Sequence, residues 1–251
     1  MLQQQIREDS YQLMNLIRSG STLNIELALQ LAKSQDIVLN LSSYTKLYTW
    51  LDYFVQGISI NNPQALLEEL FELEVLNLSL SQQKKIPPFI GLLSNLRVLI
   101  LSLNNLTSLP KTIGQLVQLE SLHLSHNKLK RLPSGIQNLQ QLKTLKLGNN
   151  QIEKLPSSIF KIKNLEHLDL EYNQITRLPL GIGQLYKLKT LNLQHNPMID
   201  LPQSLCSLTN LKKLVLPAHF AQKSSSIELI NKLPTCAIQF GNNIAVINKQ
   251  Y

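Results

Sequence analysis

Residues 119–141 read LESLHLSHNKLKRLPSGIQNLQQ, and residues 142–164 read LKTLKLGNNQIEKLPSSIFKIKN. Each stretch has 23 residues, and the two carry leucine, asparagine and a leucine–proline pair at matching positions. A single unit of this length is too small to bury its own apolar side chains, so neighbouring units must cover them. The repeat therefore predicts a solenoid, a fold that grows by stacking one coil on the next.

The same period extends on both sides of this pair, from residue 73 to residue 216. Three leucine columns recur in seven successive units: Leu73, Leu96, Leu119, Leu142, Leu165, Leu188 and Leu211; Leu76, Leu99, Leu122, Leu145, Leu168, Leu191 and Leu214; Leu78, Leu101, Leu124, Leu147, Leu170, Leu193 and Leu216. An apolar residue followed by proline recurs in six units: Ile86–Pro87, Leu109–Pro110, Leu132–Pro133, Leu155–Pro156, Leu178–Pro179 and Leu201–Pro202. The unit is LxxLxLxxNxLxxLPxxIxxLxx.

The spacing within the unit predicts its local structure. The last two leucines of LxxLxL are two residues apart, so both point to one face of a short strand. Stacked strands form a parallel sheet, and the proline fixes the turn that leaves it. The Ixx[LI] spacing predicts a helical or extended return segment at the back. Because the back segments are bulkier than the strands, we expect the sheet on the concave face.

This unit resembles the leucine-rich repeat family, in the 23-residue class found in bacterial proteins and in Ras-associated intracellular proteins. The resemblance covers residues 73–216, and residues 233–240 (LPTCAIQF) resemble the C-terminal caps of bacterial members. It implies an α/β leucine-rich repeat solenoid that acts as a binding scaffold. The motif is specific for the fold and says little about the partner.

The two ends depart from the period and are expected to cap the solenoid. The chain is thus divided into a helical N-terminal region (1–72), the repeats (73–216) and a C-terminal cap (217–251). The predicted N-terminal helices cover residues 4–18, 24–34, Ser42 or Ser43 to about Phe54, and Pro63 to Phe71, with Asn62 as the last N-cap. Trp50 and Tyr53 are expected to lie in the core. A helix over 224–233 and an edge strand over 236–240 are expected in the C-terminal cap.

An asparagine column stands at the ninth position of the unit: Asn104, Asn127, Asn150, Asn173 and Asn196. A row of amides could bind a ligand. We favour a structural role, because a buried amide can bond to backbone groups at the turn and in the next coil. Ser81 and His219 replace asparagine in the terminal units.

Composition narrows the class of function. No apolar run resembles a signal peptide or a membrane span, which favours a cytoplasmic protein. Cys206 and Cys236 are too few for a disulfide framework or a metal set. No phosphate-binding, nucleotide-binding or hydrolase motif occurs, so we expect neither an enzyme nor a cofactor. The net charge of +8 is uneven, because residues 1–72 carry four basic and eight acidic side chains. The net charges are therefore −4 for that region and +12 for the rest, which suggests different roles.

Side chains between the strand leucines should face the concave surface, where solenoids bind their partners. The early coils offer apolar residues there, and the middle coils offer polar ones with four of the five histidines and one tyrosine. This mixture fits a protein or peptide interface, which needs anchors and orienting hydrogen bonds. Alternatively, these residues only keep the surface soluble. The candidate residues are Val98, Ile100, Leu103, His123, His126, Lys146, Asn149, His167, Asp169, Glu171, Tyr172, Gln194 and His195.

The histidines do not predict a metal site. His123 and His126 lie two coils from His167 and Asp169, and strands spaced by about 4.8 Å put the two pairs about 10 Å apart. Histidines of ordinary pKa could instead make binding sensitive to pH.

A second row, just before the leucine–proline pair, is mostly basic. Its members include Lys85, Arg131, Lys154 and Arg177. This basic ridge is the alternative site, for an acidic protein, anionic lipid or nucleic acid, unless it is only a solvated face. Nucleic acid is disfavoured because Tyr172 is the only aromatic residue nearby.

Overall fold

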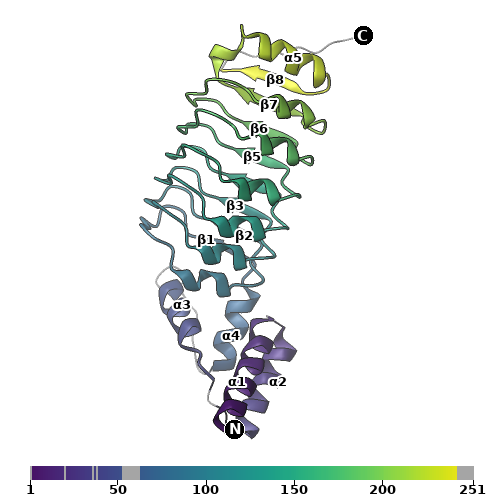
Figure 1. Cartoon of the computed structure of the whole chain (residues 1–251). Helices are drawn as coiled ribbons and strands as arrows, with labels where there is room; N and C mark the ends of the chain where they lie inside the picture. Colours follow the sequence, from purple (N-terminus) through teal and green to yellow (C-terminus); the bar gives the residue numbers. More distant parts are fainter. Residues whose placement is uncertain (1, 20, 36, 38, 53–62, 242–251) are drawn as a thin grey trace.

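A computed structural model of the chain describes residues 2–19, 21–35, 37, 39–52 and 63–241. Figure 1 shows a stack of coils with helices α1 to α4 at one end and helix α5 at the other. The predicted α/β solenoid is confirmed.

Eight strands form one parallel sheet in chain order. They are β1 (Val75–Asn77), β2 (Val98–Ile100), β3 (Ser121–His123), β4 (Thr144–Lys146), β5 (His167–Asp169), β6 (Thr190–Asn192), β7 (Lys213–Leu216) and β8 (Ala237–Phe240). Neighbouring strands pair in the register of the repeat, as Leu99 with Leu122 and Leu122 with Leu145. The last pair is offset by one residue more, because Lys213 lies opposite Ala237.

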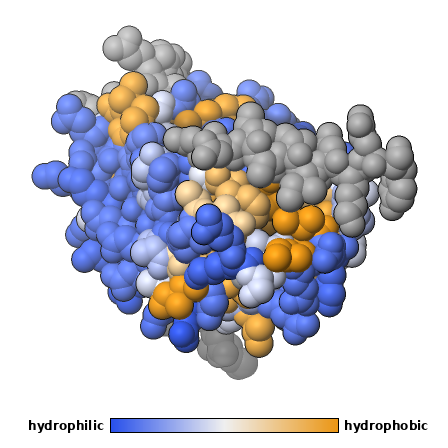
Figure 2. Space-filling model, turned by 90° about the horizontal axis from the view of Figure 1, so that it is seen from above, coloured by the Kyte–Doolittle hydropathy of each residue, from blue (hydrophilic) through white to orange (hydrophobic). Residues whose placement is uncertain are grey.

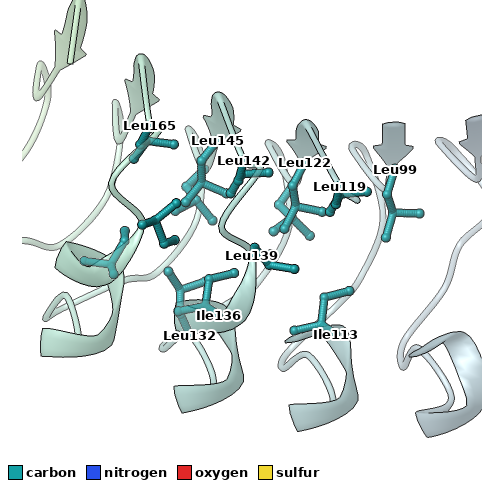
Figure 3. Packing of buried hydrophobic residues seen from close by; sticks show 14 of the residues in the cluster. Leu99, Ile113, Leu119, Leu122, Leu132, Ile136, Leu139, Leu142, Leu145 and Leu165 are labelled. Atoms are coloured by element: carbon teal, nitrogen blue, oxygen red, sulfur yellow. The ribbon is translucent and has the colours of Figure 1, made fainter. Parts of the chain in front are cut away.

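The strand leucines point into the solenoid, where the apolar residues of the return segments meet them. Leu122 is fully buried, whereas Ser121 and His123 on either side of it are half-buried. Figure 3 shows Leu122 and Leu145 beneath the strands, with Ile113 and Ile136 rising from the back of the coils. All four side chains are 0% exposed, so each coil's core is sealed by its neighbours.

Short 3-10 helices form the back of each repeat: η1 (Pro88–Leu92), η2 (Lys111–Gln115), η3 (Ser134–Asn138), η4 (Ser157–Lys161), η5 (Leu180–Gln184) and η6 (Gln203–Ser207). The proline of the leucine–proline pair lies immediately before each helix, in an extended conformation with φ between −63° and −70°. Proline holds φ near this value, so the repeat fixes the entry to each helix. The spacing left helical and extended segments open, and the structure has 3-10 helices.

The asparagine column holds adjacent coils together, as predicted. Asn150 is 8% exposed, and its Nδ2 donates to the carbonyl oxygens of Leu124 (2.9 Å) and Leu147 (3.0 Å). Its Oδ1 accepts from the backbone N–H of Leu129 at 3.0 Å. Asn127 makes the equivalent bonds one coil earlier, and the other members of the column do the same. The hydrogen-bonding groups of these asparagines are therefore engaged inside the solenoid.

Helices lie at both ends. They are α1 (Leu2–Arg18), α2 (Thr22–Ser34), α3 (Ser42–Asp52), α4 (Pro63–Glu72) and α5 (Ser224–Lys232). The predictions for Tyr53, Phe54 and Asn62 lie outside the described residues, whereas Trp50 is half-buried against the core. The two helices nearest the N-terminus begin two residues earlier than their period indicated. Another short helix, η7 (Ala218–Phe220), follows β7.

The edge strand predicted over 236–240 and the helix predicted over 224–233 are confirmed as β8 and α5, and the sheet thus continues into the C-terminal cap. Strand β8 pairs with β7, and Leu229 of α5 and Phe240 of β8 are buried. Seen along the solenoid from this end, hydrophilic residues form much of the visible surface and hydrophobic residues appear in separate patches (Figure 2). We keep the division of the chain at residues 72 and 216 as a proposal. The sheet extends across the second of these boundaries, because β8 pairs with β7.

Candidate binding surface on the strand face

The outward side chains of the strands form a continuous surface, which we name the strand face. A hollow of about 530 Å³ lies on it over β3 to β7. Its lining residues are Ser121, His123, Thr144, Leu145, Lys146, His167, Leu168, Asp169, Thr190, Leu191, Asn192, Lys213 and Val215. Hydroxyl, imidazole, amide, ammonium and carboxylate groups thus meet in one depression.

The structure places twelve of the thirteen candidate residues where a partner could reach them. Five are exposed: Leu103, His126, Lys146, Tyr172 and His195. Seven are half-buried: Val98, Ile100, His123, Asn149, His167, Asp169 and Glu171. The prediction that Gln194 lies on the binding surface is wrong, because this residue is only 7% exposed. Its side-chain amide bonds to His195 at 3.0 Å, so it is buried beneath the surface instead of facing a partner.

The eighth position of the unit lies beyond the strands and has a conformation that the periodicity did not predict. Its members are Leu80, Leu103, His126, Asn149, Tyr172 and His195, with φ between 50° and 60°. Each non-glycine residue in this left-handed region is under strain. The repeated fold holds it there, because the N–H of Tyr172, for example, donates to the carbonyl of Gln194 in the next coil at 3.0 Å. We name this row the left-handed edge of the strand face.

Tyr172 and His195 form an aromatic platform on this edge. Their ring centroids are 4.0 Å apart, and the ring planes differ by 13°. Tyr172 remains 48% exposed, although it stacks on one side. The platform offers a flat apolar surface with polar tips, which is the character of an interface anchor. The sequence contained the signal, since the two residues are one period apart in the same column.

Carboxylates lie beside the platform and are held by neighbouring groups. Asp169 Oδ1 accepts from the N–H of Glu171 at 3.1 Å, and Glu171 Oε2 accepts from the amide of Asn192 at 3.0 Å. Glycine at 148 leaves room for this arrangement, because a Cβ there would lie 3.0 Å from Asp169 Oδ2. Each carboxylate is therefore oriented by a hydrogen bond from a neighbouring group, which favours recognition of a partner's hydrogen-bond donors.

His123 lines the hollow, and the pKa of its imidazole is lower than usual. Burial lowers the pKa of this imidazole, and the nearby ammonium group of Lys146 lowers it further. Both effects disfavour the charged form. His123 is therefore neutral at pH 7, where it can both donate and accept a hydrogen bond.

We expect an NMR titration of the His123 imidazole to give a midpoint below the ordinary value of about 6.5. Lys146→Met should raise the midpoint part of the way, since the larger effect of burial remains. Lys85→Met, which removes a distant exposed charge, should leave it unchanged. Because the folded state takes up this proton less readily than the unfolded chain, stability should fall as the pH drops below about 6.5. A midpoint at or above 6.5 would contradict this reading of the hollow.

A ladder of alternating charges runs along the second position of the unit and was not anticipated. Glu120 pairs with Arg97 in the preceding coil and with Lys143 in the next, the latter at 2.6 Å. Glu166 pairs with Lys189 at 2.5 Å. Hydrogen bonds to these cations lower the pKa of both carboxyls, of Glu120 and of Glu166. The alternating signs at a spacing of 23 residues were visible in the sequence, and only the stacking shows that they meet.

The basic ridge is solvent-exposed at Lys85, Arg131, Lys154 and Arg177. Arg177 Nε lies 3.9 Å from Asp200 Oδ2, so one end of the ridge is partly neutralised. Exposed pairs of this kind contribute little to stability. The ridge therefore remains a predicted site for an anionic partner.

The remaining reactive groups do not point to catalysis. Burial raises the pKa of the Cys236 thiol to about 11 and also raises that of Cys206, which disfavours the nucleophilic thiolate. Within the described part of the chain there is no group of three or more histidine, cysteine or acidic residues that could hold a metal ion. None of the helices in those segments is long and apolar enough to cross a membrane.

Comparison with known proteins identifies the repeats. A family model described as leucine-rich repeat region matches residues 111–234, and a second, described as leucine rich repeat, matches residues 71–129. No curated protein matches the chain.

Three solved structures are similar. A leucine-rich repeat protein of Leptospira interrogans is 33% identical, with a TM-score of 0.56, over 63% of this chain and 40% of that one. An internalin of Listeria monocytogenes is 23% identical, with a TM-score of 0.58, over 73% of this chain and 52% of that one. A TDR receptor is 27% identical, with a TM-score of 0.51, over 62% and 28%. The chain thus spans about half or less of each of these proteins.

Proposed function

Since the chain belongs to the leucine-rich repeat family, we propose that it is a non-catalytic interaction module that binds a protein or peptide on its strand face. Members of this family typically act as interaction scaffolds, and the similar structures include a receptor. The observation that carries the proposal is the hollow of about 530 Å³ over β3 to β7. The aromatic platform follows β5 and β6, two of the strands that line this hollow.

The chemistry of the strand face supports a peptide-like partner. Backbone and side-chain polar groups of a peptide would find donors at Lys146 and Asn192 and acceptors at Asp169. Apolar side chains would find Leu80 (71% exposed) and Leu103 (48% exposed) on the left-handed edge. An aromatic anchor, a hollow that offers both polar and apolar groups, and exposed leucines on two further coils fit an extended segment better than a compact small molecule.

Two tyrosines of nearly equal exposure allow a matched test. Tyr172 on the strand face is 48% exposed, and Tyr186, just after η5 on the back, is 49% exposed. We expect proteins captured from the source organism's lysate by the wild-type chain to be retained by Tyr186→Ala and lost with Tyr172→Ala, whose affinity should fall about tenfold or more. Ile100→Asp should also reduce capture, because it places a charge in β2, among the apolar residues of the first coils.

The salt dependence separates this proposal from the basic ridge. Capture through the strand face should persist at moderate salt, whereas capture through the ridge should weaken steeply as salt screens its charges. If Tyr172→Ala and Ile100→Asp both retain the partner while Arg131→Gln with Lys154→Gln loses it, the ridge is the binding site and the strand-face proposal is wrong. Quantitative mass spectrometry of the eluates measures each outcome.

A further inference from the structure

A second pocket lies at the junction between the N-terminal helices and the first two repeats, away from the strand face. It has a volume of about 460 Å³, and its walls come from α1, α3, η1 and η2 and the turns that follow the 3-10 helices. The polar side chains in its lining are Arg18, Tyr44, Ser94 and Gln115. Among the described residues that line it, Arg18 is the only charged one.

Two of these polar groups are buried without a well-formed hydrogen bond. Tyr44 is 1% exposed, and no described group meets its hydroxyl oxygen in good hydrogen-bond geometry, although the guanidinium of Arg18 lies close enough to interact with it. The hydroxyl oxygen of Ser94 has no hydrogen-bond partner among the described residues. A buried hydroxyl left unpaired costs about 1–3 kcal/mol, so a ligand that accepts hydrogen bonds from both hydroxyls would gain binding free energy in this pocket.

The charge of the pocket indicates which kind of ligand it would bind. Arg18 is exposed, and its Nη1 donates to Asn15 Oδ1 at 3.2 Å, which leaves other guanidinium donors available. Burial raises the pKa of the Tyr44 hydroxyl, and the nearby Arg18 opposes that effect without reversing it. Tyr44 is therefore a neutral donor beside a cation.

The floor of the pocket is shaped by a close contact between coils. Gln115 Oε1 lies against Gly91, where a Cβ would be only 2.3 Å from that oxygen. Glycine at this position lets the Gln115 side chain lie against the first coil beside Ser94. The four polar side chains thus come from two helices and two repeats and meet only in the folded protein.

We propose that this pocket binds an oxyanion, the carboxylate or phosphate group of a small ligand, through Arg18, Tyr44 and Ser94. A guanidinium next to two hydroxyl donors is suited to a group that carries negative charge and accepts several hydrogen bonds. A bound anion would connect α1 and α3 to the first repeats, so its binding should stabilise the junction between the helical region and the solenoid.

The test uses the full chain at constant pH and ionic strength, with sodium chloride replaced by phosphate or by acetate. With a Kd of about 1 mM, phosphate at about 10 mM should raise Tm by about 3 °C or more. Arg18→Gln and Tyr44→Phe should lose this rise. Lys46→Gln, which removes an exposed cation from the same helix as Tyr44, should keep it. A rise with acetate as well assigns the site to carboxylates and phosphates alike, and a rise with phosphate alone assigns it to phosphate.

The Tyr44→Phe variant also tests the buried hydroxyl without any ligand. Its Tm in chloride should equal or exceed that of the wild type, because the change removes a buried group without a well-formed hydrogen bond. An equal response of wild type and Arg18→Gln to phosphate would show a general salt effect and overturn the proposal. A clear drop in Tm for Tyr44→Phe in chloride would also count against it, since the hydroxyl would then be well bonded within the chain.

Discussion

Asn150→Ala is expected to lower the free energy of unfolding by about 3 kcal/mol. The change removes the acceptor of the Leu129 N–H and a donor to the carbonyls of Leu124 and Leu147, all inside the solenoid. Urea unfolding followed by circular dichroism measures the loss. Asn138→Ala, an exposed asparagine in η3, should change stability by less than about 0.5 kcal/mol.

The column predicts a specific pattern of non-additivity. The carbonyl of Leu124 accepts from Asn127 at 3.1 Å and from Asn150 at 2.9 Å, so each single variant leaves it one donor. Asn127→Ala with Asn150→Ala removes both, and the double variant should lose more than the sum of the single losses. Asn127 and Asn173 donate to no common carbonyl. The losses of stability from Asn127→Ala and Asn173→Ala should therefore add in the double variant. Equal behaviour of the two pairs would contradict the interlocked ladder.

The sequence was sufficient to assign the apolar and asparagine columns of the repeat to their places in each coil. Leu122, Ile136 and Asn127 could be assigned to strand, back and turn because each recurs in a column whose chemistry allows one environment. The strand register followed at once, since neighbouring coils are related by the 23-residue repeat. Burial of whole columns is a strong constraint, and local propensity had little to add.

Features that depend on backbone conformation were harder to predict from the sequence. Leucine rarely adopts a positive φ, so Leu80 and Leu103 gave no sign of the left-handed edge. Asn149 and the histidines at that position tolerate this conformation better, and only the column as a whole shows that one geometry is imposed on all of them. Gln194 was misplaced for a related reason: the chain leaves the strand after three residues, so the pattern of alternation cannot be extended to it.

The sequence could not predict a site between the helical region and the repeats. Arg18, Tyr44 and Ser94 belong to segments with no common period, and their proximity depends on how α1 and α3 pack against η1 and η2. Periodicity orders the solenoid along one dimension and carries no information on that packing. The poorly bonded hydroxyls become visible only when hydrogen bonds are assigned in the fold.

The spacing of the coils at the back depends on small residues that the leucine pattern does not include. Gly114 in η2 faces Gly135 in η3, and a Cβ on Gly114 would lie 2.1 Å from the Gly135 carbonyl oxygen. Two coil pairs further on, between η4 and η5, the side chain of Phe160 occupies the space that a Cβ on Gly181 would need, with 2.3 Å between them. Adjacent coils thus fit because a larger residue on one is matched by glycine on the next, or because two glycines meet.

Gly114→Ala is therefore expected to destabilise the protein by about 3 kcal/mol, because the added methyl group meets a backbone carbonyl that cannot move without separating the coils. The usual effect of glycine to alanine at a position with negative φ has the opposite sign, a gain of about 0.4–1 kcal/mol from the unfolded state. Gly148→Ala is the matched control, since its Cβ would meet the movable carboxylate of Asp169 at 3.0 Å. Urea unfolding should rank Gly114→Ala well below Gly148→Ala. If the two variants are equally stable, η2 and η3 are not in backbone contact, and the tight stacking of the coils at their back is wrong.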